Sequence, residues 1–160
     1  MSKIRQSFTL IELLIVIAII VILTTAAIPI YGNLQVESQL NESSAQIIQI
    51  LRTARGRSVA GLNDATHGVY FEINSGNDKY ILYQGPSYTE RESNYDRETT
   101  LDDSLHISTT LVDNDVNFSK GFGLPLGAGL PNAGAIILTH ETSGNRTISI
   151  NSLGIIKESH

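Results

Sequence analysis

The residue types that most often carry catalytic or metal chemistry are few in this sequence, and they are widely spaced. None of the 160 residues is a cysteine, and the four histidines are His67, His106, His140 and His160. No two histidines have the helical spacing of a zinc site, and no cysteine is available as a ligand or nucleophile. We therefore expect no catalytic residue, no metal site and no cofactor, and we expect that the protein is not an enzyme.

Two weaker patterns offer groups that could bind a ligand. Asp102-Asp103 and Asp113-Asn114-Asp115 supply oxygen ligands for calcium, but they lack the EF-hand spacing, and we favour a solvated acidic loop. Gly121-Phe122-Gly123 and Gly127-Ala128-Gly129 could cradle phosphate. They lack the preceding strand, the following helix and the lysine that such a loop needs, so we expect a flexible surface connection.

A single charge, Glu12, lies inside the most apolar stretch of the chain, which runs from Phe8 to Tyr31. At 1.5 Å of rise per residue, a helix of about 20 residues crosses a hydrocarbon core of about 30 Å. We therefore predict a membrane-spanning helix over residues 8–31. An unpaired carboxylate in that position costs on the order of 3 kcal/mol, and Pro29 near the exit is also unusual for a plain anchor. Both residues point to a purpose beyond anchoring.

This apolar stretch, preceded by a short basic leader and ending in Ile28-Pro29-Ile30-Tyr31, resembles the N-terminal methylation motif of type IV pilins and type II secretion pseudopilins. In one frame, Glu12 is the fifth residue after the cleavage point and Pro29 is the twenty-second. The resemblance implies that prepilin peptidase cuts between Ser7 and Phe8, that Phe8 is N-methylated, and that Glu12 and Pro29 act in assembly. The family usually has glycine where this chain has Ser7, which is also small.

Two other interpretations of the same stretch are a cleaved signal peptide and an ordinary signal anchor. Lys3 and Arg5 ahead of an apolar run fit either of them, and Thr25-Ala26-Ala27 resembles a signal peptidase site. The length of the run and the presence of Glu12 within it argue against a cleaved signal. We favour the pilin-like interpretation.

We divide the chain into a prepilin leader (1–7), a transmembrane helix (8–31), an amphipathic helix that continues it (32–61) and a β-sheet globular domain (62–160). A content of 41% hydrophobic residues leaves room for one modest domain beside the anchor. The basic leader predicts a cytoplasmic N-terminus and a domain on the periplasmic or extracellular side. Residues 66–160 hold 12 acidic and 6 basic residues, so the domain is acidic.

The polar stretch from Gly32 to Ala60 has helical spacing. Apolar and small residues step by four and three along one face, which comprises Leu40, Ser44, Ile47, Leu51, Ala54 and Ser58, with Ile48 and Val59 beside it. Gly61 and Asn63-Asp64 tolerate the left-handed backbone that ends helices. We expect this helix to pack on the globular domain through that face.

From Thr66 onward the apolar residues recur every second position, which indicates strands. Residues 67–73 and 79–84 flank a turn that contains glycine and predict a β-hairpin, and residues 85–104 are an expected exposed loop. Further strands are predicted at 105–111 and 116–118. The last third predicts a three-stranded meander at 135–139, 146–150 and 155–157. The fold class is therefore α+β, with a long N-terminal α-helix packed on a C-terminal antiparallel β-sheet domain.

Two regions are similar to GspH/FimT-type minor pseudopilins. In residues 52–60, the pair Ala54-Arg55 precedes a serine and an alanine, as at the end of the first helix in those proteins. The arginines Arg52, Arg55 and Arg57 could form a basic patch, but we expect them to reach solvent or to pair with the acidic domain. The C-terminal region, from the glycine-rich loop to the glycine before the final strand, is also similar. Many major type IV pilins carry a C-terminal disulfide, so the lack of cysteine favours a pseudopilin or minor pilin.

Two classes of function are compatible with these patterns. We favour a minor pseudopilin or minor pilin, a subunit held in the inner membrane until it assembles into a type II secretion pseudopilus or a type IV pilus. Its expected partners are other pilin or pseudopilin subunits, prepilin peptidase, the inner-membrane assembly platform and membrane lipid. The alternative is a membrane-tethered binding module that does not assemble, for example one that captures DNA in competence. The acidic domain and the barely basic residues 155–160 make nucleic acid an unfavourable partner.

Overall fold

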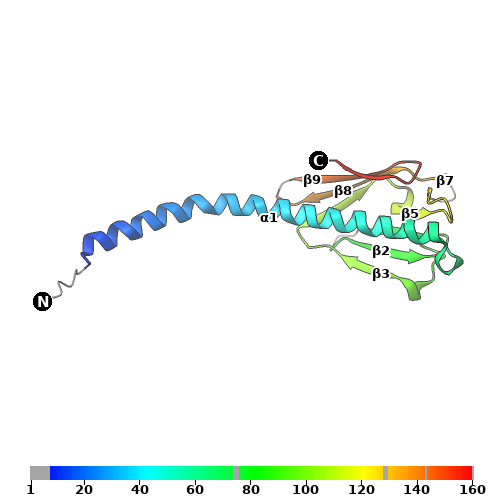
Figure 1. Ribbon diagram of the computed structural model, residues 1–160, viewed down its shortest axis with the longest axis horizontal. Coiled ribbons are helices and arrows are strands. Elements are labelled where there is room, and N and C mark those ends of the chain that lie inside the picture. The colour runs from blue at the N-terminus through cyan, green and yellow to red at the C-terminus, as the bar shows by residue number, and fades with distance from the viewer. Residues whose placement is uncertain (1–7, 74–75, 128–129, 143, 160) are drawn as a thin grey trace, which may run out of the picture. The chain divides into compact units, whose positions relative to one another are not determined.

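The computed structural model describes residues 8–159 except 74–75, 128–129 and 143, and it leaves aside the side chains of residues 26–31 and 130–131. Its first element is the helix α1, Leu10–Ala60 (Figure 1). The chain forms two compact units, one up to Gln35 and one from Val36 to the C-terminus. The second unit contains the end of α1 and all of the strands.

Within the second unit, α1 buries one face. Its fully or nearly fully buried residues are Leu40, Ser44, Ile47, Leu51, Ala54 and Ser58. These are the six residues of the predicted amphipathic face, and their steps of four and three match the 3.6-residue period of the helix. Ile48 is partly buried against the same cluster, whereas Val59 remains exposed.

The helix ends where the backbone turns left-handed. Gly61 follows Ala60 with φ 63°, and Asn63 and Asp64 also have positive φ, of 55° and 60°. Glycine and asparagine adopt this region at low cost, which is why they end helices so often. A short 3-10 helix, η1 (Leu62–Asp64), then leads into the first strand.

The first sheet has the order β3-β2-β1-β5-β6-β7 and is antiparallel throughout. Its strands are β1 (His67–Glu72), β2 (Lys79–Gln84), β3 (Arg97–Thr100), β5 (Asp115–Phe118), β6 (Pro125–Gly127) and β7 (Leu130–Pro131). The predicted hairpin is confirmed as β1 and β2, with Val69 opposite Leu82.

Two predictions about loops were wrong. The stretch 85–104 was expected to be a loop, but it contains a 3-10 helix, η2 (Ser93–Tyr95), and the strand β3. β3 has an exposed and polar sequence, so its strand state comes from pairing with β2 and not from a pattern of its own. The expected flexible connection 121–131 contains β6 and β7, which extend the first sheet.

The second sheet has the order β10-β9-β8-β4. Its strands are β4 (Leu105–Thr109), β8 (Gly134–His140), β9 (Asn145–Ile150) and β10 (Ile156–Ser159). The predicted C-terminal meander is confirmed as β8, β9 and β10, with antiparallel pairing between neighbours. A 3-10 helix, η3 (Val112–Asn114), joins the two sheets between β4 and β5.

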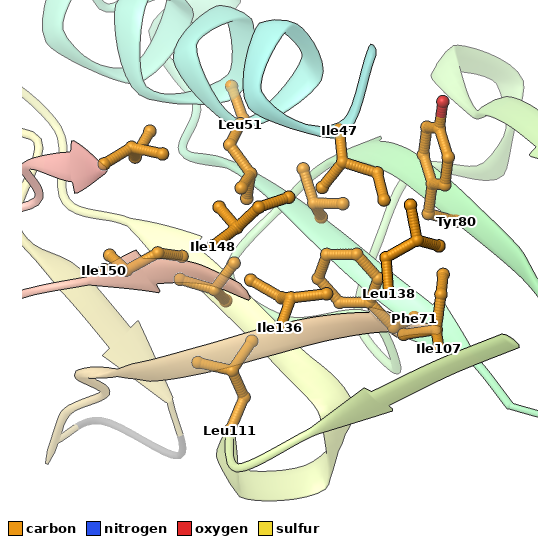
Figure 2. Close-up of a cluster of buried hydrophobic side chains, with 14 of the residues drawn as sticks. Ile47, Leu51, Phe71, Tyr80, Ile107, Leu111, Ile136, Leu138, Ile148 and Ile150 are labelled. Carbon is orange, nitrogen blue, oxygen red and sulfur yellow. The ribbon is translucent and has the colours of Figure 1, made fainter. Parts of the chain in front are cut away.

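One hydrophobic core joins α1 to both sheets. Figure 2 shows Ile47 and Leu51 extending from the helix toward Phe71 of the first sheet and Ile148 of the second. In Figure 1, β8 and β9 lie along one side of this part of α1, and β2 and β3 lie along the other. The α+β fold class, with a long helix packed on antiparallel sheets, is confirmed.

Candidate processing and assembly site

Two of the residues predicted to act in processing and assembly, Phe8 and Glu12, lie at the start of α1. Phe8 precedes the helix and its side chain is 75% exposed. Glu12 lies in the first helical turn and is also exposed. Ser7, on the other side of the predicted cleavage point, lies outside the described residues.

Thr9 caps this end of the helix. Its Oγ1 accepts a hydrogen bond from the backbone N–H of Glu12 at 3.3 Å, and its carbonyl accepts one from the N–H of Leu13 at 3.2 Å. A threonine cap followed three residues later by glutamate is the pattern of a capping box, and a carboxylate in the first turn also complements the helix dipole. The backbone N–H of Glu12 therefore takes part in the cap, and the Glu12 residue itself is exposed.

The first turns of α1 expose apolar side chains in every direction. From Leu10 to Leu23, the large apolar residues are between 43% (Val16) and 81% (Leu10) exposed. Because successive helical residues are about 100° apart, such a run covers the whole circumference of the helix. No part of the described chain covers this surface, since every residue from 8 to 25 is exposed.

The polar side chains at the end of this run are satisfied within the helix. The Thr24 hydroxyl donates to the carbonyl oxygens of Ile20 and Val21, and the Thr25 hydroxyl donates to that of Ile22, each at 2.9 Å. Threonines that bond back to the preceding turn present only their methyl groups outward. Glu12 is therefore the one charged group among residues 8–25.

Among the described residues, no helical stretch is both long enough and apolar enough to cross a membrane. Pro29 lies within α1, but the side chains of residues 26–31 are outside those described. Its predicted role in assembly, and the predicted span over residues 8–31, remain predictions.

The geometry above places Phe8, the Thr9 cap and Glu12 at the head of an exposed apolar helix. Residues 2–28 match the family model of the prokaryotic N-terminal methylation motif. This motif is a prepilin signal of the type IV pilin kind, so the match identifies residues 2–28 as a type IV pilin-like N-terminal signal. No curated protein and no solved structure matches the chain.

The acidic residues that we considered as calcium ligands make different local contacts. Asp102 is exposed and its carboxylate accepts hydrogen bonds from the backbone and hydroxyl of Ser104, which lower its pKa. Asp113 and Asn114 have positive φ in the turn before β5. No group of three histidine, cysteine or acidic residues within the described part of the chain could hold a metal ion.

Asp115 is not the solvated residue that we expected. Both of its carboxylate oxygens lie within hydrogen-bond distance of the Tyr83 hydroxyl, at 2.8 and 3.0 Å, and Asn117 donates to the same hydroxyl at 3.1 Å. Burial raises the pKa of the Asp115 carboxyl to about 6, because desolvation disfavours its charged form. Burial, and then the nearby Asp115, also raise the pKa of Tyr83.

This cluster depends on Gly68 in β1. A Cβ atom at Gly68 would lie 2.3 Å from the Tyr83 hydroxyl oxygen, so only glycine leaves room for the ring.

The Tyr88 ring stacks on Tyr70 at 3.8 Å between centroids, and the guanidinium of Arg91 lies 3.8 Å from the Tyr88 ring centroid. These contacts hold part of the polar stretch after β2 against the first sheet.

Three of the four histidines lie in the described part of the chain, each in a different strand, and His160 lies outside it. His67 is buried in β1, where burial and the positive charge of Arg57 lower its pKa. His106 lies between two carboxylates, with Nδ1 3.8 Å from Asp78 and Nε2 3.5 Å from Glu141. His140 lies in β8, and its Nε2 is 3.1 Å from the side-chain oxygen of Gln39 on α1.

Proposed function

We propose that this chain is a minor pseudopilin or minor pilin, a structural subunit that assembles through its N-terminal helix into a type II secretion pseudopilus or a type IV pilus. Its resemblance to GspH/FimT-type proteins favours the minor class, and the methylation motif over residues 2–28 supports the pilin type. In this role the chain is a building element and not an enzyme.

One observation carries the proposal, namely the exposure of the apolar run from Leu10 to Leu23 on all sides of α1. Exposed apolar surface on this scale marks a site of contact with a membrane or with other proteins. A pilin-like helix makes both kinds of contact in succession: lipid covers it before assembly, and the helices of neighbouring subunits cover it afterwards.

The anchored form follows from the same segment. Residues 8–31 span the inner membrane once, with the N-terminus in the cytoplasm and the C-terminal domain on the periplasmic side, as Lys3 and Arg5 favour. Prepilin peptidase cuts between Ser7 and Phe8 and the new amine of Phe8 is methylated. Pro29 removes one backbone donor and gives the helix a place to bend when subunits pack.

Glu12 receives a partner only in the assembled form. The amine of Phe8 on a neighbouring subunit keeps its positive charge after methylation, and it offsets the burial of the Glu12 carboxylate. The Thr9 cap is compatible with this role, because it uses the backbone N–H of Glu12 and leaves the carboxylate available. The alternative, a tethered binding module, needs the helix as an anchor but needs no partner for Glu12.

Fractionation of cells that carry the sibling subunits tests the proposal. We expect the chain in sheared filaments, shortened by residues 1–7 and carrying a methylated Phe8 by mass spectrometry. Cells that lack prepilin peptidase should retain the uncut chain in the membrane fraction. If the chain stays in the membrane while its siblings appear in filaments, the tethered module is the better account.

A further inference from the structure

The exposed large apolar side chains of the second unit are concentrated where α1 ends. More than half of those described lie in three short segments that meet there, and we call them the apolar patch: Val59, Phe122, Leu124, Leu153 and Ile155. The others are Leu62, Ile73, Tyr95 and Val112. Phe122 is 78% exposed and Leu153 is 61% exposed. A group of exposed apolar side chains at one place on a folded domain marks a surface that contacts a partner.

The three segments of the apolar patch touch one another around Arg55. Its Nε donates to the carbonyl of Gly123 at 3.1 Å. A Cβ atom added to Gly123 would lie 2.7 Å from Cγ2 of Val59. A Cβ atom added to Gly154 would lie 2.2 Å from the Gly123 carbonyl oxygen. The other four patch residues flank these two glycines, and Figure 1 shows the loop between β9 and β10 at the same end of the second unit as the end of α1. The patch is therefore one surface, although its segments are far apart in the sequence.

Hydrogen bonds fix the two turns that carry most of the patch. In the turn before β6, the N–H of Gly121 donates to the carbonyl of Ser58 on α1 at 3.1 Å. In the turn between β9 and β10, the side-chain oxygen of Asn151 accepts from the N–H of Leu153 at 3.0 Å and from that of Ile155 at 2.9 Å. Apolar side chains on a fixed backbone lose less conformational entropy when a partner covers them, which favours binding.

The unpaired charge beside the patch is positive. Arg52 and Arg55 lie one turn apart on the face of α1 that leads to Val59. Among the described residues, no carboxylate lies within ion-pair distance of either guanidinium, and the hydrogen bond from Arg55 to a carbonyl leaves its charge in place. Lys120 adds no free charge, because it pairs with Asp64. A partner that covers this surface therefore needs apolar side chains with carboxylates next to them.

We propose that the apolar patch binds a sibling pilin-like subunit whose facing surface combines apolar side chains with carboxylates opposite Arg52 and Arg55. Burial of the patch supplies the affinity, and the charge pairs set the orientation. The inference rests on the proposed function, in which the neighbours of this chain are sibling subunits. It names the part of the second unit that contacts one of them.

A protein surface fits this patch better than a membrane or DNA does. One or two carboxylates on a protein are enough to pair with the two arginines. An anionic membrane and DNA both present a continuous negative surface, which residues 66–160 repel because they hold 12 acidic and 6 basic residues.

Photo-cross-linking of the full chain, in cells that carry the sibling subunits, tests the contact. Phe122 is replaced by p-benzoylphenylalanine, which keeps an aromatic side chain at the patch. We expect a light-dependent product whose second peptide, identified by mass spectrometry, comes from a protein that itself carries the N-terminal methylation motif. The matched control carries the same group at Tyr95, which is 49% exposed and lies outside the patch, and should give several-fold less of that product.

Charge reversal supplies a second readout. Arg52→Glu should lower the yield of the sibling cross-link several-fold, because it places a carboxylate against the carboxylates of the partner. Arg97→Glu makes the same change at an exposed arginine of β3 and should leave the yield unchanged. Reversal of a carboxylate near the cross-linked peptide of the sibling should restore the yield with Arg52→Glu.

Several results would overturn the contact: cross-links only to lipid, to a second copy of this chain or to proteins without the motif, equal yields from positions 122 and 95, or equal yields for Arg52→Glu and Arg97→Glu. The proposed function is judged separately, by the presence of the chain in filaments. A chain that enters filaments without the sibling cross-link contradicts the contact alone. A chain that is absent from filaments while its siblings are present contradicts the proposed function, whatever the cross-link shows.

Discussion

The two halves of α1 use apolar residues in opposite ways. From Leu10 to Leu23 the apolar side chains surround the helix and are exposed, whereas from Leu40 to Ser58 the apolar and small residues form one buried face. The second half is covered by the core of its own unit, since Ile47 and Leu51 pack with residues from both sheets (Figure 2). The first half has no buried residue among positions 8–25.

Removal of the first half gives the largest expected effect. A fragment that begins at Gly32 should be soluble and monomeric, because it keeps the buried face of α1 and loses the exposed apolar run. Gel filtration should show monomer size, and circular dichroism should show both helix and strand. An unfolded or aggregated fragment would mean that the second half does not fold without the first.

Truncation of one leucine in each half sharpens the comparison. Leu51 is 0% exposed, and Leu51→Ala should lower the free energy of unfolding by roughly 2–5 kcal/mol, because it removes buried methyl groups and leaves a cavity. The matched variant Leu14→Ala should leave the unfolding of the domain unchanged, since Leu14 is exposed.

Urea denaturation of the full chain in detergent, followed by tyrosine fluorescence, measures both variants, since the chain has no tryptophan. Equal losses of stability for Leu51→Ala and Leu14→Ala would show that the two halves are not separate in their packing.

The stability of the second unit should depend on pH through Asp115. Its pKa is about 6 in the folded chain, compared with an ordinary value of 3.8, so the folded state holds a proton that the unfolded state has lost. The contribution of Asp115 to stability is then complete below about pH 4, and roughly 3 kcal/mol of it is lost as the pH rises through 6. Asp115→Asn, which stays neutral, should remove this part of the pH dependence.

Denaturant titrations of the Gly32 fragment between pH 4 and 7 measure the effect, with Asp113→Asn as the control because Asp113 is exposed. If the free energy of unfolding changed with pH in the same way for the native fragment and for Asp115→Asn, the raised pKa of the Asp115 carboxyl would be contradicted.

Binding to DNA should give the smallest effect. Residues 66–160 carry 12 acids and 6 bases, and non-specific affinity for nucleic acid derives mainly from neutralised phosphates. The Gly32 fragment should therefore show no mobility shift at micromolar concentration and about 150 mM salt. A shift that Arg52→Ala abolishes would reveal a local basic surface on α1 and would favour the alternative of DNA capture.

The parts of the fold with a clear period could be predicted from the sequence. Apolar residues that repeat about every 3.6 residues predict the buried face of α1 from Leu40 to Ser58. Apolar residues that repeat every second residue predict the β1–β2 hairpin and the C-terminal meander. β3 could not be found in this way, because its residues are polar and exposed and its pairing with β2 depends on tertiary context. The partly buried Asp115 was missed because the acidic residues near it in sequence resemble a solvated loop.

The candidate site rests on a different kind of signal in the sequence. Glu12 stands out as a lone charge in an apolar run, and this anomaly is visible without any structure. Its partner is not visible in either the sequence or one copy of the chain, because the proposed partner belongs to a neighbouring subunit. The structure adds the Thr9 cap, which engages the backbone N–H of Glu12.

A matched pair of substitutions isolates the charge of Glu12. Glutamine is close to glutamate in size and also suits this position of a capping box, but it carries no charge, so Glu12→Gln removes the pairing and keeps a polar side chain. Glu12→Leu removes both the charge and the polar side chain. Each variant should insert into the membrane at least as readily as the native chain, because burial of the carboxylate costs on the order of 3 kcal/mol.

The central claim, that Glu12 serves assembly, is tested most directly by the amounts of native, Glu12→Gln and Glu12→Leu chain in the membrane and filament fractions of cells with the sibling subunits. Loss of the charge leaves the neighbouring Phe8 amine buried and unpaired, at a cost of roughly 3–5 kcal/mol. We predict normal membrane amounts and strongly reduced filament amounts for both variants. Native amounts of Glu12→Gln in filaments would contradict the account, because they would show that assembly does not need the charge.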